Sequence, residues 1–153
     1  MEPEGLIELR EITMANFREC IGLSVEDDQR GFVAPNIYSL AEAKADGVST
    51  PLAIYADGKM VGFTMYNFDS KLGTGFIDRL MVAAEQQGRG YGRAAMTEVL
   101  RRLLATPGCR RIQTSFEPTN TVAERLYEGL GFHKTGELDD GEVVVVLELP
   151  QGD

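Results

Sequence analysis

Tryptophan is absent from this sequence, histidine occurs once and cysteine twice. Cys20 and Cys109 lie far apart and have no partner histidine cluster, which argues against a disulfide framework or a zinc site. We therefore expect buried thiols, no bound metal and no chemistry at His133. Long apolar runs are lacking, and the first residues, MEPEGLIELR, contain neither a basic region followed by an apolar block nor a small-residue cleavage site. The expected location is the cytoplasm.

Positive charge is scarce in this chain. With 24 acidic against 15 basic side chains, the formal net charge is -9 at pH 7. This excess opposes binding to nucleic acid or to anionic membranes, and it favours a cationic substrate over an anionic one. The same charge also keeps a protein soluble without any role in binding. The 153 residues, 43% of them apolar, fit a single domain over residues 1–153 with one core.

Apolar periodicity and turn signals divide the chain into short strands and helices. Thr13 and Ser39 are expected to cap two helices, the second through a capping box with Glu42. Asp57-Gly58 and residues 139–141 are expected hairpin turns. The predicted strands cover residues 6–13, 52–56, 59–68, 73–84, 110–116, 132–138 and 142–149, and the predicted helices cover 15–23, 39–45, 90–106 and 121–130.

The order of these elements, β-α-α-β-β-β-α-β-α-β-β, predicts an α/β (α+β) domain. We expect a mixed, mainly antiparallel sheet of about seven strands, flanked by about four helices. One parallel step is expected, where the strand 73–84, a glycine-rich turn, the helix 90–106 and the strand 110–116 form a βαβ unit.

The glycine-rich turn between residues 87 and 93 predicts an anion site. Gly88, Gly90 and Gly92 alternate with other residues just before a helix, and glycine permits the positive φ that lets a turn present several N–H groups to one side. Arg89 and Arg93 stand at the helix start, where they oppose the helix dipole. A bound anion would relieve that conflict, because free N–H groups at a helix start suit phosphate oxygens.

Two nucleotide-binding alternatives are less consistent with the whole chain. No run has the spacing and the Lys-Ser/Thr ending of a nucleoside triphosphate loop. Gly90, Gly92 and Ala95 do fit a dinucleotide fingerprint, with Glu117 as a ribose-binding carboxylate. However, a doubly wound domain should alternate strands and helices from its start, whereas three strands run consecutively before this turn. In a third interpretation, the glycines bind no ligand and serve only to connect a strand to a helix.

Two motifs suggest which phosphate ligand is bound. The run QGRGYG at residues 87–92 fits Q/R-x-x-G-x-G/A, and Asn120 to Tyr127 fit N-x-x-A-x-x-L-Y, followed by Gly131-Phe132. In these motifs, and in element order from Leu6 to Leu149, the chain resembles the GNAT superfamily of N-acetyltransferases. The resemblance implies acetyl-coenzyme A as cofactor, with its pyrophosphate on the glycine turn and its pantetheine arm where two strands splay apart. The implied cofactor-binding residues are Leu80, Met81, Val82, Gln87, Gly88, Arg89, Gly90, Tyr91, Gly92, Arg93, Asn120, Ala123 and Tyr127.

Acetyl transfer to an amine needs a neutral amine, a stabilised oxyanion and a proton for the departing thiolate, but no metal. Tyr127 resembles the family tyrosine beside the coenzyme sulfur and is the candidate acid; otherwise it is an aromatic residue packed in the core. Asp78, in an apolar strand, and Glu117, at the end of the next strand, are candidates for binding the amine and accepting its proton. Alternatively, Asp78 pairs with an arginine and Glu117 only precedes a turn.

Further segments resemble one branch of the superfamily. AIYADGKMVGFTMY, IDRLMV and TGELDDGE are similar to the bacterial diamine and polyamine acetyltransferases of the spermidine or spermine type. In that branch the segment corresponding to VEDDQRGFVAPN helps to form the acceptor site, and here it carries Glu26, Asp27 and Asp28. The resemblance implies a small polycationic amine, which these carboxylates would attract; a solvated acidic loop is the alternative.

Other functions stay open from the sequence. An aminoglycoside, an amino acid or a protein N-terminus is an alternative acceptor within the same class. An alternative from a different class of function is a module that binds acyl-coenzyme A or a polyamine without turnover. The apolar strand Val143–Val146 also offers an edge through which two copies could pair as a homodimer.

Overall fold

The computed structural model describes residues 7–150, which form one seven-stranded sheet, four α-helices and two short 3-10 turns. The strands are β1 (Ile7–Glu11), β2 (Thr50–Ala56), β3 (Lys59–Asp69), β4 (Thr74–Val82), β5 (Arg111–Phe116), β6 (His133–Asp139) and β7 (Glu142–Glu148). The helices are α1 (Phe17–Gly22), α2 (Asn36–Asp46), α3 (Tyr91–Leu104) and α4 (Thr121–Gly129), and the 3-10 turns are η1 (Asp27–Gln29) and η2 (Ala84–Gln86). Leu6, which we expected in the first strand, lies outside the described residues.

The sheet is mixed, as the element order predicts. Its strands are ordered β1-β2-β3-β4-β5-β7-β6, and every neighbouring pair is antiparallel except β4 and β5. The single parallel pair, β4 and β5, belongs to the βαβ unit in which α3 connects the two strands. A dinucleotide fold would need a mostly parallel sheet wound in two halves, so this topology excludes that alternative.

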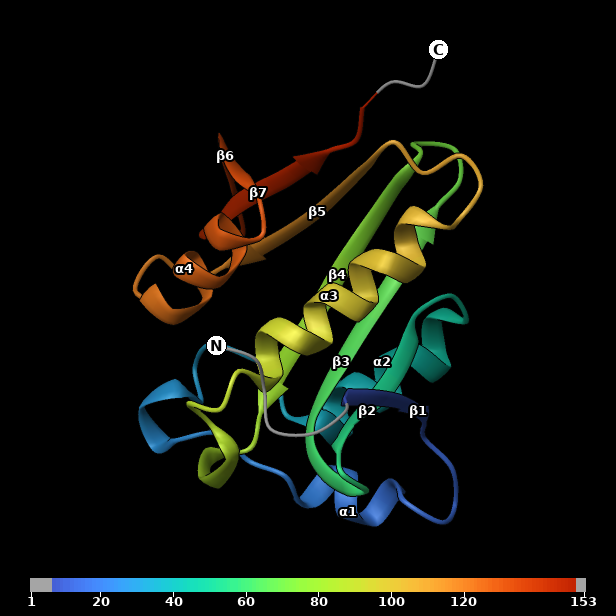
Figure 1. Ribbon diagram of the computed structural model, residues 1–153, viewed down its shortest axis with the longest axis vertical. Helices are drawn as coiled ribbons and strands as arrows, with labels where there is room; N and C mark the ends of the chain where they lie inside the picture. The colour runs from blue at the N-terminus through green and yellow to red at the C-terminus, as the bar shows by residue number, and fades with distance from the viewer. Residues whose placement is uncertain (1–6, 151–153) are drawn as a thin grey trace.

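Helices cover both faces of the sheet. Helix α3 lies across β3 and β4 in Figure 1, and with α4 it covers one face over a core that includes Ile77, Met96 and Tyr127. Helices α1 and α2 cover the other face over a second core that includes Phe63 and Met65. No helix within residues 7–150 is long and apolar enough to cross a membrane.

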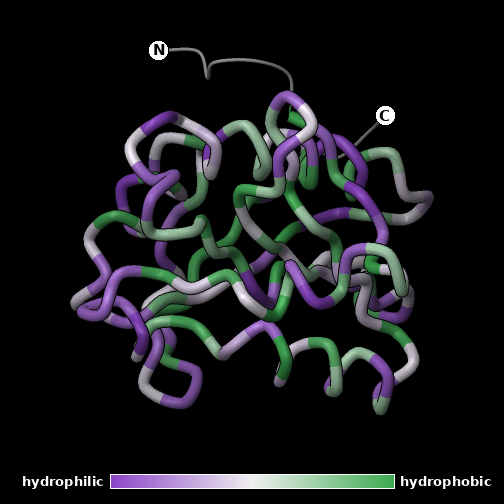
Figure 2. Tube along the Cα trace, turned by 90° about the horizontal axis from the view of Figure 1, so that it is seen from below, coloured by the Kyte–Doolittle hydropathy of each residue, from purple (hydrophilic) through white to green (hydrophobic). Residues whose placement is uncertain are grey.

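This layering explains why β2 is apolar at successive positions. Leu52 and Ile54 face the α3 side, whereas Ala53 and Tyr55 face the α1 and α2 side, and all four are buried. In Figure 2 hydrophobic and hydrophilic stretches alternate along the trace, and hydrophilic stretches are frequent in the outer turns. The hairpin between β2 and β3 turns at Asp57 and Gly58, with φ of 51° and 78°, which confirms the predicted turn.

Two predicted helix starts are wrong. Thr13 Oγ1 accepts a hydrogen bond from Ala15 N and Thr13 N donates to Asn16 Oδ1, so these residues form a polar turn and α1 begins only at Phe17. Helix α2 begins at Asn36, three residues before the predicted cap. Ser39 is therefore a buried residue inside the helix, where its hydroxyl accepts a hydrogen bond from Arg79.

The proposed dimer edge is also wrong. Strand β7 lies between β5 and β6, so its backbone groups are paired on both sides within the chain. Val144, Val145 and Val146 are buried. The continuous apolar run Val143–Val146 therefore reflects an inner strand of the sheet and does not offer a free edge to a second copy.

Candidate active site

Strands β4 and β5 run together at one end and then separate (Figure 1). Their parallel register runs from the Thr74–Arg111 pair to the Phe76–Gln113 pair. The next link is a side-chain bond, because Thr114 Oγ1 donates to the Ile77 carbonyl oxygen at 2.9 Å. Beyond it β4 continues while β5 follows β7, which confirms the predicted splayed step. The separation opens a cleft of about 1110 Å³.

One edge of β4 pairs with β3, and the backbone N–H and C=O groups on its other edge face the cleft. On the opposite edge, Thr64 Oγ1 of β3 donates to the Arg79 carbonyl oxygen at 2.8 Å. Because backbone groups of successive residues point to alternate edges of a strand, those of Leu80 and Val82 point into the cleft. The side chain of Met81 packs in the core under α1 and α2. A ligand with amide groups can therefore pair with this edge as an added strand.

The glycine-rich turn lies at the end of this edge. Gly88 and Gly90 have φ of 80° and 83°, a conformation that glycine adopts without strain, and Gly90 is the N-cap of α3. Both residues line the cleft. The first N–H groups of a helix have no partner within the helix, so the start of α3 offers donors to an anion at this place.

Side chains near the turn mostly stabilise the fold. Gln87 Nε2 donates to the Val82 carbonyl oxygen at 2.9 Å, and Tyr91 is buried in the core. Arg93 lines the cleft, but its guanidinium donates to a backbone carbonyl of α4 at 3.3 Å. Arg89 is exposed and is not among the cleft-lining residues. The backbone N–H groups, rather than the arginines, are thus the donors placed for an anion.

Helix α4 forms the opposite wall of the cleft. Asn120 is its N-cap, and Asn120 Oδ1 accepts from Ala123 N at 3.2 Å. Both residues line the cleft, as does Tyr127 one turn further along. The predicted motif residues of α4 therefore share one space with the edge of β4.

Tyr127 is a buried residue that also lines the cleft. Its ring stacks on Phe116 with centroids 6.3 Å apart and meets the edge of Phe132 at 5.4 Å. Burial raises the pKa of the Tyr127 hydroxyl to about 12, and a hydrogen bond with Thr114 acts in the opposite direction. The hydroxyl therefore keeps its proton at neutral pH and can act as a donor.

Asp78 lies on the cleft wall one residue beyond the Ile77 link. Its side chain reaches solvent, and Asn67 Nδ2 donates to its Oδ2 at 2.6 Å. Burial by the surrounding sheet raises the pKa of Asp78, while the bond from Asn67 lowers it. A carboxylate with a raised pKa is better suited to accept a proton near neutral pH.

Comparison with known proteins identifies the family. The family model of the acetyltransferase (GNAT) family matches residues 6–132. The chain belongs to this family. It is 32% identical over 150 residues to the spermine/spermidine N(1)-acetyltransferase of Bacillus subtilis, an alignment that covers 94% of this chain and 99% of that protein.

Aminoglycoside acetyltransferases are also similar to this GNAT chain. An aminoglycoside N(6')-acetyltransferase of Klebsiella pneumoniae is 34% identical over 77 residues, which cover 49% of this chain and 38% of that protein. The solved structure of an aminoglycoside acetyltransferase in complex with coenzyme A and kanamycin has the same fold, with a TM-score of 0.78 and 22% identity over 94% of this chain and 95% of that one.

Some predicted acceptor-site residues of this GNAT domain lie away from the cleft. Glu117 follows β5 and is not among the lining residues. Glu26, Asp27 and Asp28 are exposed on and before η1, outside the lining, and Asp27 pairs with Arg30 at 3.3 Å. The 3-10 turn directs these carboxylates to solvent while the next residues of the same segment border the cleft.

Three carboxylates that sequence reasoning missed line the cleft of this GNAT domain. Asp139, Asp140 and Glu142 lie at the turn between β6 and β7, and Glu142 Oε1 accepts from Ser115 Oγ at 2.8 Å. The sequence predicts a hairpin turn here, and TGELDDGE resembles the polyamine acetyltransferases, but neither feature places these carboxylates at the cleft. This turn lies far from β4 in the sequence. It reaches the cleft because β7 pairs with β5, and that pairing cannot be read from the sequence of the turn.

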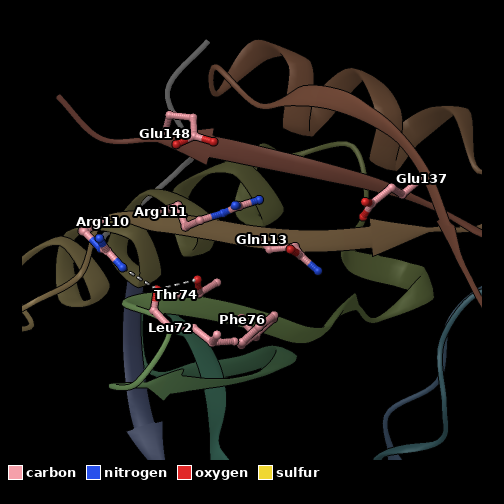
Figure 3. Close-up of a pocket in the computed structure, with 8 residues that line it drawn as sticks. All are labelled: Leu72, Thr74, Phe76, Arg110, Arg111, Gln113, Glu137 and Glu148. Carbon is pink, nitrogen blue, oxygen red and sulfur yellow. Dashed lines mark hydrogen bonds between the residues drawn. The ribbon is translucent and has the colours of Figure 1, made fainter. Parts of the chain in front are cut away.

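A second hollow of about 500 Å³ lies at the paired end of β4 and β5 (Figure 3). It is bordered by Thr74 and Phe76 of β4, by Arg111 of β5 and by Glu148 of β7. Arg110 beside it donates to a backbone carbonyl at 3.2 Å. Neither the glycine turn nor Tyr127 borders this hollow, so the wider cleft is the candidate active site of the GNAT domain.

Proposed function

We propose that this chain transfers the acetyl group of acetyl-coenzyme A to a primary amine of a small cationic acceptor, with a diamine or polyamine such as spermidine or spermine preferred. The observation that carries the proposal is the cleft between β4 and β5, which a free strand edge, a glycine turn at a helix start and Tyr127 border together. Membership of the GNAT family supports acetyl transfer, and the Bacillus subtilis relative supports the acceptor class.

The residues of the cleft fit acetyl-coenzyme A, which supplies the acetyl group as a thioester. The backbone groups of Leu80 and the N–H of Val82 would bind the amides of its pantetheine arm in the manner of an added strand, while the Val82 carbonyl oxygen already accepts from Gln87 Nε2. The N–H groups that follow Gly88 and Gly90 would bind its pyrophosphate, because they are free donors at the positive end of the α3 dipole.

Two side chains of the cleft hold and move protons in this proposal. The Tyr127 hydroxyl keeps its proton at neutral pH and would donate it toward the departing sulfur. Asp78, directly or through a water, would accept the proton that the acceptor amine must lose. Tyr127 approaches the cleft from α4 and Asp78 from β4, so the two groups can act on different atoms of the same reaction.

Charge around the cleft supports a polycationic acceptor. Four carboxylates line it, Asp78, Asp139, Asp140 and Glu142, together with three arginines, Arg30, Arg79 and Arg93. Two of these arginines are paired with carboxylates outside the lining, and the chain as a whole carries a net charge of -9. A field of this sign raises the local concentration of polycations and opposes anions. Aminoglycosides are polycations too, so the similarity to aminoglycoside acetyltransferases makes them the second candidate acceptor.

The acceptor is tested by thiol release with purified protein, acetyl-coenzyme A and a panel of amines. We expect kcat/KM for spermidine, spermine or a diamine to exceed that for a simple monoamine by about tenfold or more, since electrostatic attraction acts on multiply charged amines. Kanamycin and a peptide with a free N-terminus complete the panel.

The same panel separates the alternatives. Preference for kanamycin over every polyamine would replace the acceptor and keep the acetyl transfer. Binding of acetyl-coenzyme A by calorimetry without thiol release from any amine would overturn the enzyme and indicate a sensing module.

A further inference from the structure

Asp78 is the extra residue of a β-bulge in β4. Arg79 pairs with Met65 and Ile77 pairs with Tyr66 on β3, so Asp78 has no opposite residue. A bulge of this kind turns two successive side chains to the same sheet face and redirects them. The bulge coincides with the point where β4 leaves β5, and this places the carboxylate on the cleft wall.

The neighbouring arginine forms no ion pair with this carboxylate, although its charge lowers the pKa of Asp78. Arg79 Nη2 forms an ion pair with Glu42 Oε1 at 3.1 Å, and Arg79 Nε donates to Ser39 Oγ at 3.1 Å, so helix α2 holds the guanidinium. Within residues 7–150 the Asp78 carboxylate forms no ion pair. Its hydrogen bond is the one that Asn67 Nδ2 donates to Oδ2 at 2.6 Å.

Asn67 approaches Asp78 from outside the cleft. It lies on β3 opposite Phe76 and is not among the cleft-lining residues. An ionised carboxylate only accepts hydrogen bonds, so the amide nitrogen of Asn67 must face it, and the bond uses one lone pair of Oδ2. Within residues 7–150 the second oxygen, Oδ1, accepts no hydrogen bond, so it is the freer of the two for a ligand in the cleft.

We propose that Asn67 is a positioning residue, which fixes Oδ2 of Asp78 and thereby presents Oδ1 to the acceptor amine or to the water that takes its proton. The inference rests on the proposed function, in which Asp78 accepts that proton. Asn67 itself touches neither the cleft nor the reacting atoms, so it acts only through Asp78.

The charges around Asp78 fix the expected direction of a pKa change. Burial raises the pKa of Asp78, Asn67 and Arg79 lower it, and Glu42 and Asp46 of α2 raise it. Removing the Asn67 amide removes one of the lowering contributions. The pKa of Asp78 must then rise further, and the acidic limb of the pH profile moves to higher pH.

The decisive variant is Asn67→Leu, with Asn67→Ala as a second variant that also lacks the donor. Carbon-13 NMR titration of the Asp78 carboxyl, assigned with Asp78→Asn, measures the pKa without any substrate. We expect the pKa of Asp78 to rise in both variants, because the ionised carboxylate loses the hydrogen bond that Asn67 donates. Asn67→Gln retains an amide donor, so the rise in the pKa of Asp78 should be smaller than in Asn67→Leu.

Kinetics supply the second measurement. The acidic limb of kcat/KM for the amine should move upward with the NMR pKa, and kcat should fall by about tenfold or more, since a displaced base reacts poorly. The ionisation of the amine is common to all variants and cancels in the comparison. Thr106→Val is the matched control, because it removes a hydrogen bond to a backbone carbonyl at 3.0 Å far from the cleft.

The two hypotheses fail in different ways. If Asn67→Leu and Asn67→Ala lower the melting temperature but leave the Asp78 titration and the acidic limb unchanged, Asn67 is only structural and the positioning role is overturned. If the titration shifts as expected while no amine is acetylated by the parent protein, the Asn67–Asp78 coupling is supported and the proposed function is overturned.

Discussion

A single residue, Tyr127, meets two requirements that the sequence presented as alternatives. Its ring packs between Phe116 and Phe132 and is almost completely buried, as expected for an aromatic residue on a helix face. The same burial raises the pKa of its hydroxyl to about 12 while the side chain still borders the cleft. Core packing and proton donation are therefore compatible, because the ring supplies the first and the hydroxyl supplies the second.

We predict that Tyr127→Phe lowers kcat by about 10²–10⁴-fold, the usual contribution of a general acid, with little change in KM for acetyl-coenzyme A. The phenylalanine ring preserves the stacking, so the melting temperature should stay close to that of the parent. Because the pKa of Tyr127 is about 12, the parent should show no loss of activity from tyrosinate formation at neutral or mildly alkaline pH. Steady-state kinetics across pH measure both quantities.

Tyr38→Phe is the control for this substitution, since Tyr38 is exposed on α2 and lies outside the cleft lining. A fully active Tyr127→Phe enzyme would make Tyr127 a packing residue alone.

At the scale of elements, the start of α3 depends on backbone conformation more than on side chains. Gly90 holds the N-cap with φ of 83°, and Gln87 fastens the preceding turn to the end of β4. The turn, the helix and the strand edge therefore form one unit around the end of the cleft. A substitution in the turn should therefore weaken cofactor binding more than it destabilises the rest of the fold.

We predict that Gly90→Val weakens binding of acetyl-coenzyme A by about tenfold or more, measured by calorimetry. A branched side chain resists positive φ, so the turn would rearrange and redirect its N–H groups. Gly47→Val is the matched control, because Gly47 ends α2 with φ of 69° and has open space around it away from the cleft.

Both substitutions should lower the melting temperature, since both strain the backbone in the same way. Only Gly90→Val should weaken binding. Equal affinities for the two variants would remove the glycine turn from the cofactor site.

At the scale of the whole molecule, electrostatics depend on where the acidic residues lie as well as on their number. The net charge of -9 attracts polycations from all directions, and this attraction is screened beyond about 8–10 Å at physiological salt. Only carboxylates at the cleft can then add short-range attraction. Asp139 and Asp140 have that position, whereas Asp27 and Asp28 do not.

We predict that Asp139→Asn with Asp140→Asn raises KM for spermidine about five- to tenfold, because each exposed charge contact is worth up to about 1 kcal/mol. Asparagine tolerates the positive φ of 50° at Asp140, so the hairpin should persist. The pair Asp27→Asn with Asp28→Asn removes the same two charges away from the cleft and should have a smaller effect. Kinetics at low and high salt measure both double variants.

KM for acetyl-coenzyme A should change little in either double variant. An equal effect of the two pairs would show that overall charge, and not the β6–β7 turn, attracts the acceptor. If KM for spermidine changes neither with salt nor in either double variant, a polycationic acceptor is contradicted.

The sequence by itself determined the order of the elements, both hairpin turns and the position of the glycine-rich turn. These features depend on local chemistry: apolar periodicity, the positive φ that Gly58 and Gly141 allow, and the free N–H groups at a helix start. It missed the start of α2, since Ser39 is a common capping residue but here accepts a hydrogen bond from Arg79 of β4.

Only the tertiary structure decided which carboxylates reach the cleft. Insertion of β7 between β5 and β6 brings Asp139 and Asp140 to its edge, whereas η1 directs Asp27 and Asp28 to solvent. The partners of Asp78 and Arg79 were equally hidden, because a one-residue bulge in β4 sets the direction of both side chains. Bulges and strand insertion arise from pairing between distant segments, and periodicity along one segment carries no information about them.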